Sequence, residues 1–115
     1  MRLPNAGLAK VGQEKITAYL LNAEHRYGAS KARFFARFGF SQANWETLAL
    51  ALLEHGRQFE VSRVTETIFG PCYEVEGELQ TPDGRTPKIR TVWQVDHGMV
   101  APRLITAYPL GKKYD

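Results

Sequence analysis

Apolar side chains recur every three or four residues through the first half of the chain, which is the spacing of one buried helix face. The clearest stripe lies between Ser41, a residue suited to cap a helix, and Gly56, a residue suited to end one. It consists of Trp45, Leu48, Ala49, Leu52 and Leu53. Shorter stripes predict one helix over residues 14–21 and another that is capped by Ser30 and ends at Gly39. The first half is therefore expected to form three helices.

Beyond Gly56 the pattern changes to β-branched and aromatic residues separated by turn signals, which is typical of an antiparallel sheet. Four strands are predicted, over residues 59–67, 72–80, 88–96 and 103–108. Three helices packed on a C-terminal four-stranded antiparallel sheet make an α+β fold, with the helices on one face of the sheet.

The faces of the second and third strands restrict how these strands pair, because a slip of one residue would turn every side chain to the other face. Apolar positions must therefore meet apolar positions. One register that satisfies this condition pairs Leu79 with Ile89, Val75 with Trp93 and Glu78 with Arg90. The opposite face, which carries Arg90 among several glutamates, is expected to be open to solvent or to a ligand.

The composition is that of an ordinary globular protein, with 43% hydrophobic and 23% charged residues in a chain of 115. We expect a single domain over residues 1–115, with a helical half over 1–56 and a sheet half over 57–115. The formal net charge of +3 permits a polyanionic partner such as RNA without requiring one. Cys72 is the only cysteine, so neither an intrachain disulfide nor a cysteine-based zinc site is possible. No signal peptide or membrane span is recognised, and a cytoplasmic location is expected.

Lys31 stands in the first turn of the second predicted helix, where free N–H groups and the helix dipole favour an anion over a cation. A phosphate bound between Lys31 and the helix would explain this placement. His25, six residues earlier, is the type of side chain that exchanges protons most readily near neutral pH. The alternative is a surface histidine in a loop beside a solvated lysine.

Polar side chains on the last two strands offer further groups for such a site. Arg90 can bind the non-bridging oxygens of a phosphodiester, or it can pair across the strands with Glu78. Thr106 and Tyr108 share one face of the last strand, and alternation places Arg103 on the other. The Tyr108 ring can stack on a base, or it can be half-buried against neighbouring side chains.

Four segments of the chain together resemble a domain-of-unknown-function family of small bacterial proteins. They are Leu3-Pro4-Asn5, residues 22–32, Ile89-Arg90-Thr91-Val92-Trp93 and residues 102–108. Family members look like stand-alone toxins beside antitoxin-like genes and resemble the tips of polymorphic, contact-dependent toxins. Their fold is similar to that of the barnase, EndoU, colicin and RelE-type superfamily. The resemblance implies a metal-independent endoribonuclease without a cofactor, which attacks through the RNA 2′-hydroxyl and has a cognate antitoxin or immunity protein as partner.

The resemblance also assigns roles to individual residues. It implies that His25 is an acid or base, that Lys31 and Arg90 clamp the phosphate, and that the RNA is positioned by the last strand. The implied catalytic residues are His25, Lys31, Arg90 and Thr106, and the implied RNA-binding residues are Arg103 and Tyr108. One departure is visible: the family usually has a proline directly after the histidine, where this chain has Arg26.

A second hypothesis comes from a different class of protein. The glutamate-rich sheet face, or an exposed edge strand, is also suited to bind a protein partner without any catalysis. A protein without activity that leaves growth unchanged and co-purifies with a neighbour would favour this interaction module.

Overall fold

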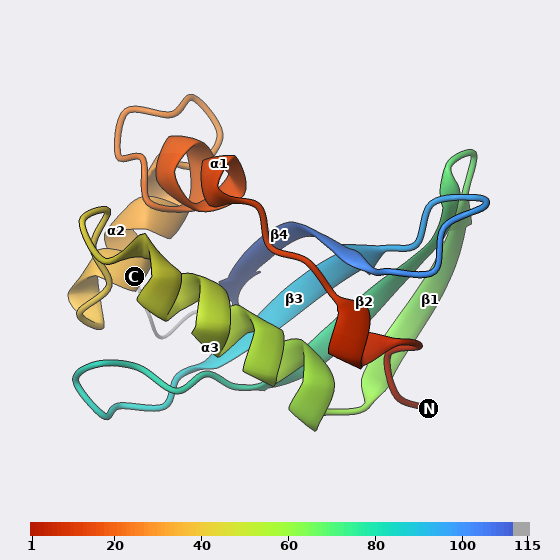
Figure 1. Cartoon of the computed structure of the whole chain (residues 1–115). Helices are drawn as coiled ribbons and strands as arrows, with labels where there is room; N and C mark the ends of the chain where they lie inside the picture. The colour runs from red at the N-terminus through yellow and green to blue at the C-terminus, as the bar shows by residue number, and fades with distance from the viewer. Residues whose placement is uncertain (112–115) are drawn as a thin grey trace.

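A helical N-terminal half packs on a four-stranded antiparallel sheet, and this α+β architecture confirms the predicted fold (Figure 1). The computed structural model describes residues 1–111, so the last four residues of the expected domain, 112–115, lie outside the described residues. The helical elements are η1 (Ala6–Leu8), α1 (Gln13–Lys15), η2 (Ile16–Leu20), α2 (Ala29–Arg37) and α3 (Trp45–Gln58). The strands are β1 (Val61–Thr67), β2 (Gly70–Glu78), β3 (Lys88–Gln94) and β4 (Arg103–Pro109). Within residues 1–111, no helix has both the length and the apolar character that a membrane span needs.

The first predicted helix is interrupted in the structure. A single α-helical turn, α1, runs directly into the π-helical turn η2, whose wider ring is closed where Leu21 N–H donates to the Ile16 carbonyl oxygen at 2.7 Å. The second helix, α2, begins at Ala29, so the prediction that Ser30 caps it is wrong, and Gly28 holds the cap position instead. Gly39 follows α2 with a φ of 99°, the left-handed conformation expected at its end.

Helix α3 continues two residues past Gly56, so the expectation that this glycine ends the helix is also wrong. Gly56 is buried, and a Cβ at this position would lie 2.6 Å from a carbon of the Trp93 indole. The glycine is therefore needed because α3 passes closely over β3. Trp93 is fully buried beneath it.

The sheet order is β1-β2-β3-β4, and the predicted register of β2 and β3 is wrong by two residues. Arg90 lies opposite Glu76 rather than Glu78, and Ile89 lies opposite Gly77 rather than Leu79. A slip of two keeps every side chain on its face, so alternation alone could not exclude it. His55 of α3 stabilises this pairing. Its Nε2 lies 3.1 and 3.2 Å from the carbonyl oxygens of the paired residues Gly77 and Ile89.

A β-bulge between β3 and β4 corrects a second prediction. Val92 pairs with Thr106 and the next residue, Trp93, pairs with Leu104, so one residue of β4 is extra. Because of this extra residue, Arg103 lies opposite Gln94 and shares a face with Thr106 and Tyr108. The expectation that Arg103 takes the opposite face is therefore wrong.

The two faces of the sheet have different surroundings. Helix α3 contacts β2 and β3 and covers the face of Trp93, whereas α1, η2 and α2 gather beside β4 (Figure 1). The β1–β2 hairpin and the β3–β4 loop extend to the side of the molecule away from α2 (Figure 1). This arrangement leaves the glutamate-rich face free of α3 and brings the early helical turns against the edge strand β4.

Candidate functional site

A hollow of about 460 Å³ lies where the early helical turns meet the edge strand β4. Its lining holds two cations or potential cations, two phenols and one hydroxyl, and it contains no carboxylate. The lining residues are Lys15, Tyr19, His25, Tyr27, Ile105 and Thr106. Two of the residues implied by the family resemblance, His25 and Thr106, are therefore at one surface depression.

Tyr19 is the centre of this group. Its hydroxyl lies 3.1 Å from Thr106 Oγ1, and the His25 imidazole meets its ring edge-on with 4.9 Å between centroids. The ammonium groups of Lys15 and Lys31 lie 5.3 and 5.5 Å from the centre of the same ring. Because His25 and Lys31 contact one side chain, the two residues lie in the same neighbourhood.

These neighbours change the acidity of the Tyr19 hydroxyl. Burial by itself would raise the pKa of Tyr19, but the hydrogen bond with Thr106 and the positive charges of Lys31 and Lys15 outweigh it, and the pKa is lowered. Tyr19 is therefore the phenol in this hollow that gives up a proton more readily than an ordinary tyrosine.

The loop before α2 fixes the orientation of the His25 ring. The backbone N–H groups of Tyr27 and Gly28 both donate to His25 Nδ1, each at 2.9 Å. Nδ1 is therefore an acceptor, which places the proton of the neutral ring on Nε2. The two donors belong to residues 27 and 28, so neither is the residue at position 26, where the family usually has a proline.

Gly28 allows the loop to approach η2. Its backbone is buried, and a Cβ there would lie 2.5 Å from the Tyr19 carbonyl oxygen and 2.8 Å from the Tyr19 ring. Only a glycine fits this approach without displacement. The His25 loop and Tyr19 are thus held together by the backbone as well as by their side chains.

Lys31 lies in the first turn of α2, as predicted, and its charge is partly engaged by the protein itself. Its Nζ lies 3.5 Å from the Tyr27 carbonyl oxygen, in addition to its position over the Tyr19 ring. The aromatic ring gives this ammonium a favourable neighbour that the sequence did not reveal.

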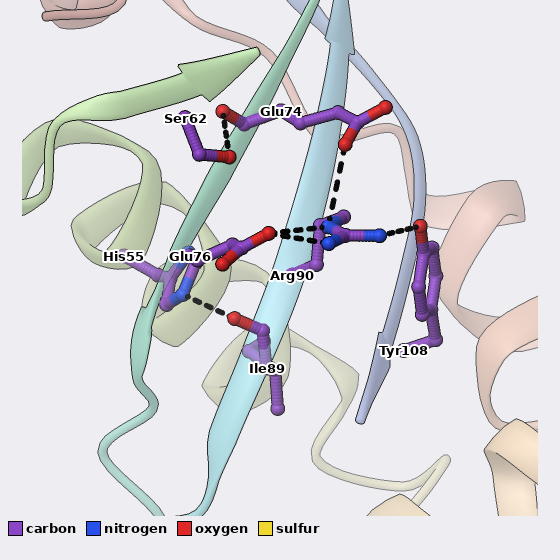
Figure 2. Close-up of polar contacts among 7 residues, drawn as sticks. All are labelled: His55, Ser62, Glu74, Glu76, Ile89, Arg90 and Tyr108. Carbon is purple, nitrogen blue, oxygen red and sulfur yellow. Dashed lines mark hydrogen bonds and ion pairs between the residues drawn. The ribbon is translucent and has the colours of Figure 1, made fainter. Parts of the chain in front are cut away.

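Arg90 is held by its own sheet (Figure 2). It binds the Glu76 carboxylate through Nε at 3.0 Å and through Nη2, it lies 3.4 Å from Glu74, and its Nη1 donates to the Tyr108 hydroxyl at 2.9 Å. The hydrogen bonds to Tyr108 and Glu76 raise the pKa of Arg90. The cross-strand ion pair that was the alternative for Arg90 is thus present, with Glu76 as the partner.

The remaining predicted residues lie along β4. Tyr108 borders a second hollow of about 500 Å³, which α2 lines with Lys31, Arg33 and Arg37. Arg103 stands at the start of β4 and forms an ion pair with Asp96, 2.7 Å away. The structure therefore gathers His25, Lys31 and Thr106 around Tyr19, continues along β4 to Tyr108, and leaves Arg103 near the β3–β4 loop.

Sequence reasoning missed Tyr19 and Lys15. Tyr19 falls among the apolar positions of the helix predicted over residues 14–21, where its spacing from Ile16 fits packing. A tyrosine four residues after a lysine, on an otherwise aliphatic face, is the signal that was present. Within residues 1–111, no group of three His, Cys, Asp or Glu side chains is placed to hold a metal ion.

The fold also occurs in a protein of known structure. A chain in the "Contact-dependent growth inhibition toxin - immunity protein complex from Klebsiella pneumoniae 342" has the same fold, with a TM-score of 0.71 at 15% sequence identity. The alignment covers 93% of this chain and 97% of that one. Residues 2–111 match the family model described as "Domain of unknown function (DUF6883)", and the chain belongs to this family. Among curated proteins, none matches the sequence.

Proposed function

We propose that this protein is the toxin of a bacterial toxin–immunity or toxin–antitoxin system and that it cleaves RNA without a metal ion. The observation that carries the proposal is the Tyr19 side chain: its ring lies near two ammonium groups and the His25 imidazole, and the hydrogen bond with Thr106 and the charges of the two lysines lower its pKa despite burial. The likeness in fold to a chain of a toxin–immunity complex supports the biological setting. A cognate immunity or antitoxin protein is the expected partner.

The groups in the hollow suit a phosphodiester substrate. Lys15 and Lys31 supply positive charge, His25 supplies a donor through Nε2, and the lining contains no carboxylate to repel a phosphate. Charge on the non-bridging oxygens grows as the transition state forms, and fixed donors and cations stabilise it. The hollow therefore suits an anionic group such as the phosphodiester of RNA better than a cationic or apolar ligand.

The proposed reaction uses the 2′-hydroxyl of the RNA. As its proton passes to a solvent water molecule, the 2′-oxygen forms a bond to phosphorus and the bond from phosphorus to the 5′-oxygen breaks. Tyr19 gives its proton to the departing 5′-oxygen, and the resulting phenolate is stabilised by Lys15 and Lys31. The products are a 2′,3′-cyclic phosphate and a 5′-hydroxyl.

His25 acts in this scheme as a hydrogen-bond donor to the phosphate. Proton transfer through the ring, as the family resemblance implies, requires that Nδ1 first release the Tyr27 and Gly28 N–H groups. The two roles separate experimentally, because glutamine retains a donor but cannot transfer a proton. We expect His25→Gln to retain more RNA cleavage than His25→Ala, whereas equal losses would assign proton transfer to His25.

Induced expression in bacteria, followed by cleavage assays on purified protein, tests the function itself. The wild-type chain should arrest growth and cut RNA to products with cyclic phosphate ends, in the presence of EDTA. The double variant His25→Ala/Lys31→Ala should do neither while keeping its melting temperature. If the wild type cleaves no RNA, and the double variant arrests growth as the wild type does, the proposal fails.

The non-catalytic interaction module remains the second candidate, and one observation favours it. Strand β1 is an exposed edge of the sheet, and the tip of its hairpin presents Ile68 and Phe69, which are 85% and 60% exposed. Exposed edges and apolar tips are where partner strands add. A growth-neutral protein without nuclease activity that binds a neighbouring gene product at 1:1 stoichiometry would support this candidate.

A further inference from the structure

Helix α2 holds the positive charge that is not balanced elsewhere in the chain. Its nine residues include Lys31, Arg33 and Arg37 and no acidic residue, and this charge equals the formal net charge of +3 of the entire sequence. The rest of the chain is therefore neutral in sum. Within residues 1–111, no salt bridge joins a cation of α2 to an acidic side chain.

The cations of α2 border a hollow rather than a flat surface. Ser30, Arg33, Phe34 and Arg37 recur at the spacing of one helix face, and all four line the hollow of about 500 Å³ beside Tyr108. Phe34 is buried, whereas Arg33 and Arg37 are exposed. Like charges four residues apart disfavour a helix by about 0.2–0.5 kcal/mol, so this arrangement is not explained by helix stability.

Two arginines near α2, in contrast, form salt bridges with acidic side chains. Arg85 donates to the Arg37 carbonyl oxygen at 2.7 Å, but its own charge is paired with Asp83. Arg90 is likewise paired with Glu76 and Glu74. The three cations of α2, by contrast, have no salt-bridge partner within residues 1–111.

We propose that this hollow, which we call the α2 subsite, binds the phosphates of a single-stranded RNA next to the one that is cleaved. This inference rests on the proposed function. Lys31 contacts Tyr19 and also lines the α2 subsite, so the subsite adjoins the reaction hollow. Arg33 and Arg37 stand about 6 Å apart along the helix axis, which lets them contact separate phosphates. Tyr108, whose hydroxyl is fixed by Arg90, offers its ring to a base.

The binding test uses a 2′-O-methylated RNA dodecamer, which cannot be cleaved because its 2′-oxygens are blocked. Affinity is measured by fluorescence anisotropy over a series of salt concentrations, for the wild type and for Arg33→Gln/Arg37→Gln. We expect the double variant to bind about tenfold more weakly and to lose about 1.4 from the slope of log affinity against log salt, the value for two phosphate contacts. Glutamine has a helix propensity close to that of arginine, so α2 should persist.

The control is Arg57→Gln/Arg63→Gln, which removes the same charge from exposed positions outside both hollows. This control variant should keep most of the affinity for the dodecamer and most of the slope of log affinity against log salt. Equal effects of the two double variants would overturn the α2 subsite, because only total charge would then matter. If Arg33→Gln/Arg37→Gln binds the dodecamer as the wild type does but loses binding to poly-L-glutamate, the hollow serves an acidic polypeptide, and the proposal is also overturned.

Cleavage assays on two substrates distinguish a failure of the α2 subsite from a failure of the proposed function. The loss of kcat/KM caused by Arg33→Gln/Arg37→Gln should be about tenfold larger for an RNA dodecamer than for a dinucleoside monophosphate, which has no flanking phosphates. A wild type that cleaves neither substrate would disprove the nuclease, while binding of the methylated RNA would still decide the subsite. A wild type that cleaves both, with equal losses in the double variant, would overturn the subsite and leave the nuclease intact.

Discussion

At the scale of single residues, the neighbours of Tyr19 determine what its hydroxyl can do. The ring of Tyr19, which belongs to η2, has two ammonium groups near its face and a hydrogen-bond partner at its hydroxyl. Positive charge stabilises a phenolate, so each neighbour makes this tyrosine a better proton donor. The chemistry therefore comes from the arrangement, and the identity of Tyr19 alone did not reveal it.

Because Gly28 lies so close to Tyr19, one added methyl group at position 28 should lower both stability and activity. Gly28→Ala would place a Cβ 2.5 Å from the Tyr19 carbonyl oxygen and must push the His25 loop away from η2. We expect a loss of about 1–3 kcal/mol in the free energy of unfolding and a large loss of RNA cleavage. The matched control is Gly12→Ala, where a Cβ meets no atom within 4 Å. Similar denaturation midpoints and activities for the two variants would contradict this account of the loop.

His55 should make stability depend on pH. His55 is buried, and burial lowers its pKa despite the hydrogen bonds to the Gly77 and Ile89 carbonyl oxygens. The unfolded chain then binds a proton more readily than the folded one. The contribution of His55 to stability is therefore complete above its unfolded pKa, about 6.5, and declines as the pH falls below that value.

Thermal denaturation between pH 7.5 and pH 5 measures this effect. The wild type should lose stability as the pH falls. His55→Gln should melt at a lower temperature at pH 7.5, because buried hydrogen bonds are lost, but should change less with pH. An equal pH dependence in both proteins would show that other groups account for it.

At the scale of elements, the sequence was informative about type and face but not about exact alignment. Helical spacing and strand alternation identified three helices and four strands. Alternation could not distinguish a register from one shifted by two residues, since both keep apolar side chains on one face. The observed register goes with tertiary contacts: His55 bonds to the paired Gly77 and Ile89 carbonyl oxygens, and a Cβ at Gly77 would be 2.3 Å from the Phe59 ring. Such tertiary contacts leave no periodic signal.

The two local irregularities beside the candidate site are also invisible to periodicity. Tyr19 lies within the π-helical turn η2, and the bulge in β4 comes directly before Thr106. Irregular turns and bulges of this kind often occur beside functional residues. His25, Lys31 and Thr106 could be selected from the sequence and its family resemblance, whereas Tyr19 required the structure.

The corrected register makes a prediction about two neighbouring glutamates. Glu76→Gln removes the carboxylate that Arg90 binds through Nε and Nη2, whereas Glu78→Gln changes a residue that lies opposite Lys88. We expect Glu76→Gln to lower the free energy of unfolding by roughly 1 kcal/mol and Glu78→Gln to lower it by less. Urea denaturation of both variants measures the difference, and a greater loss in Glu78→Gln would favour the register with Glu78 opposite Arg90.

At the scale of the whole molecule, the candidate site belongs to neither half alone. The early helical segments contribute Lys15, Tyr19, His25 and Lys31, while β4 contributes Thr106 and Tyr108. The helical half therefore supplies residues of the candidate site in addition to packing on the sheet. Its basic helix α2 lies beside the same strand, so both hollows and the unbalanced charge occur together at one edge of the molecule.

The central claim is that Tyr19 donates a proton during RNA cleavage, and the pH dependence of cleavage by Tyr19→Phe tests it most directly. Removal of the hydroxyl should lower kcat/KM by about 10²–10⁴-fold. The wild-type rate should fall at alkaline pH, below the range of an ordinary tyrosine because the pKa is lowered, and this fall should disappear in the variant. Tyr73→Phe, on β2, is the control. If Tyr19→Phe cleaves RNA at the wild-type rate with the same alkaline fall, the claim is contradicted.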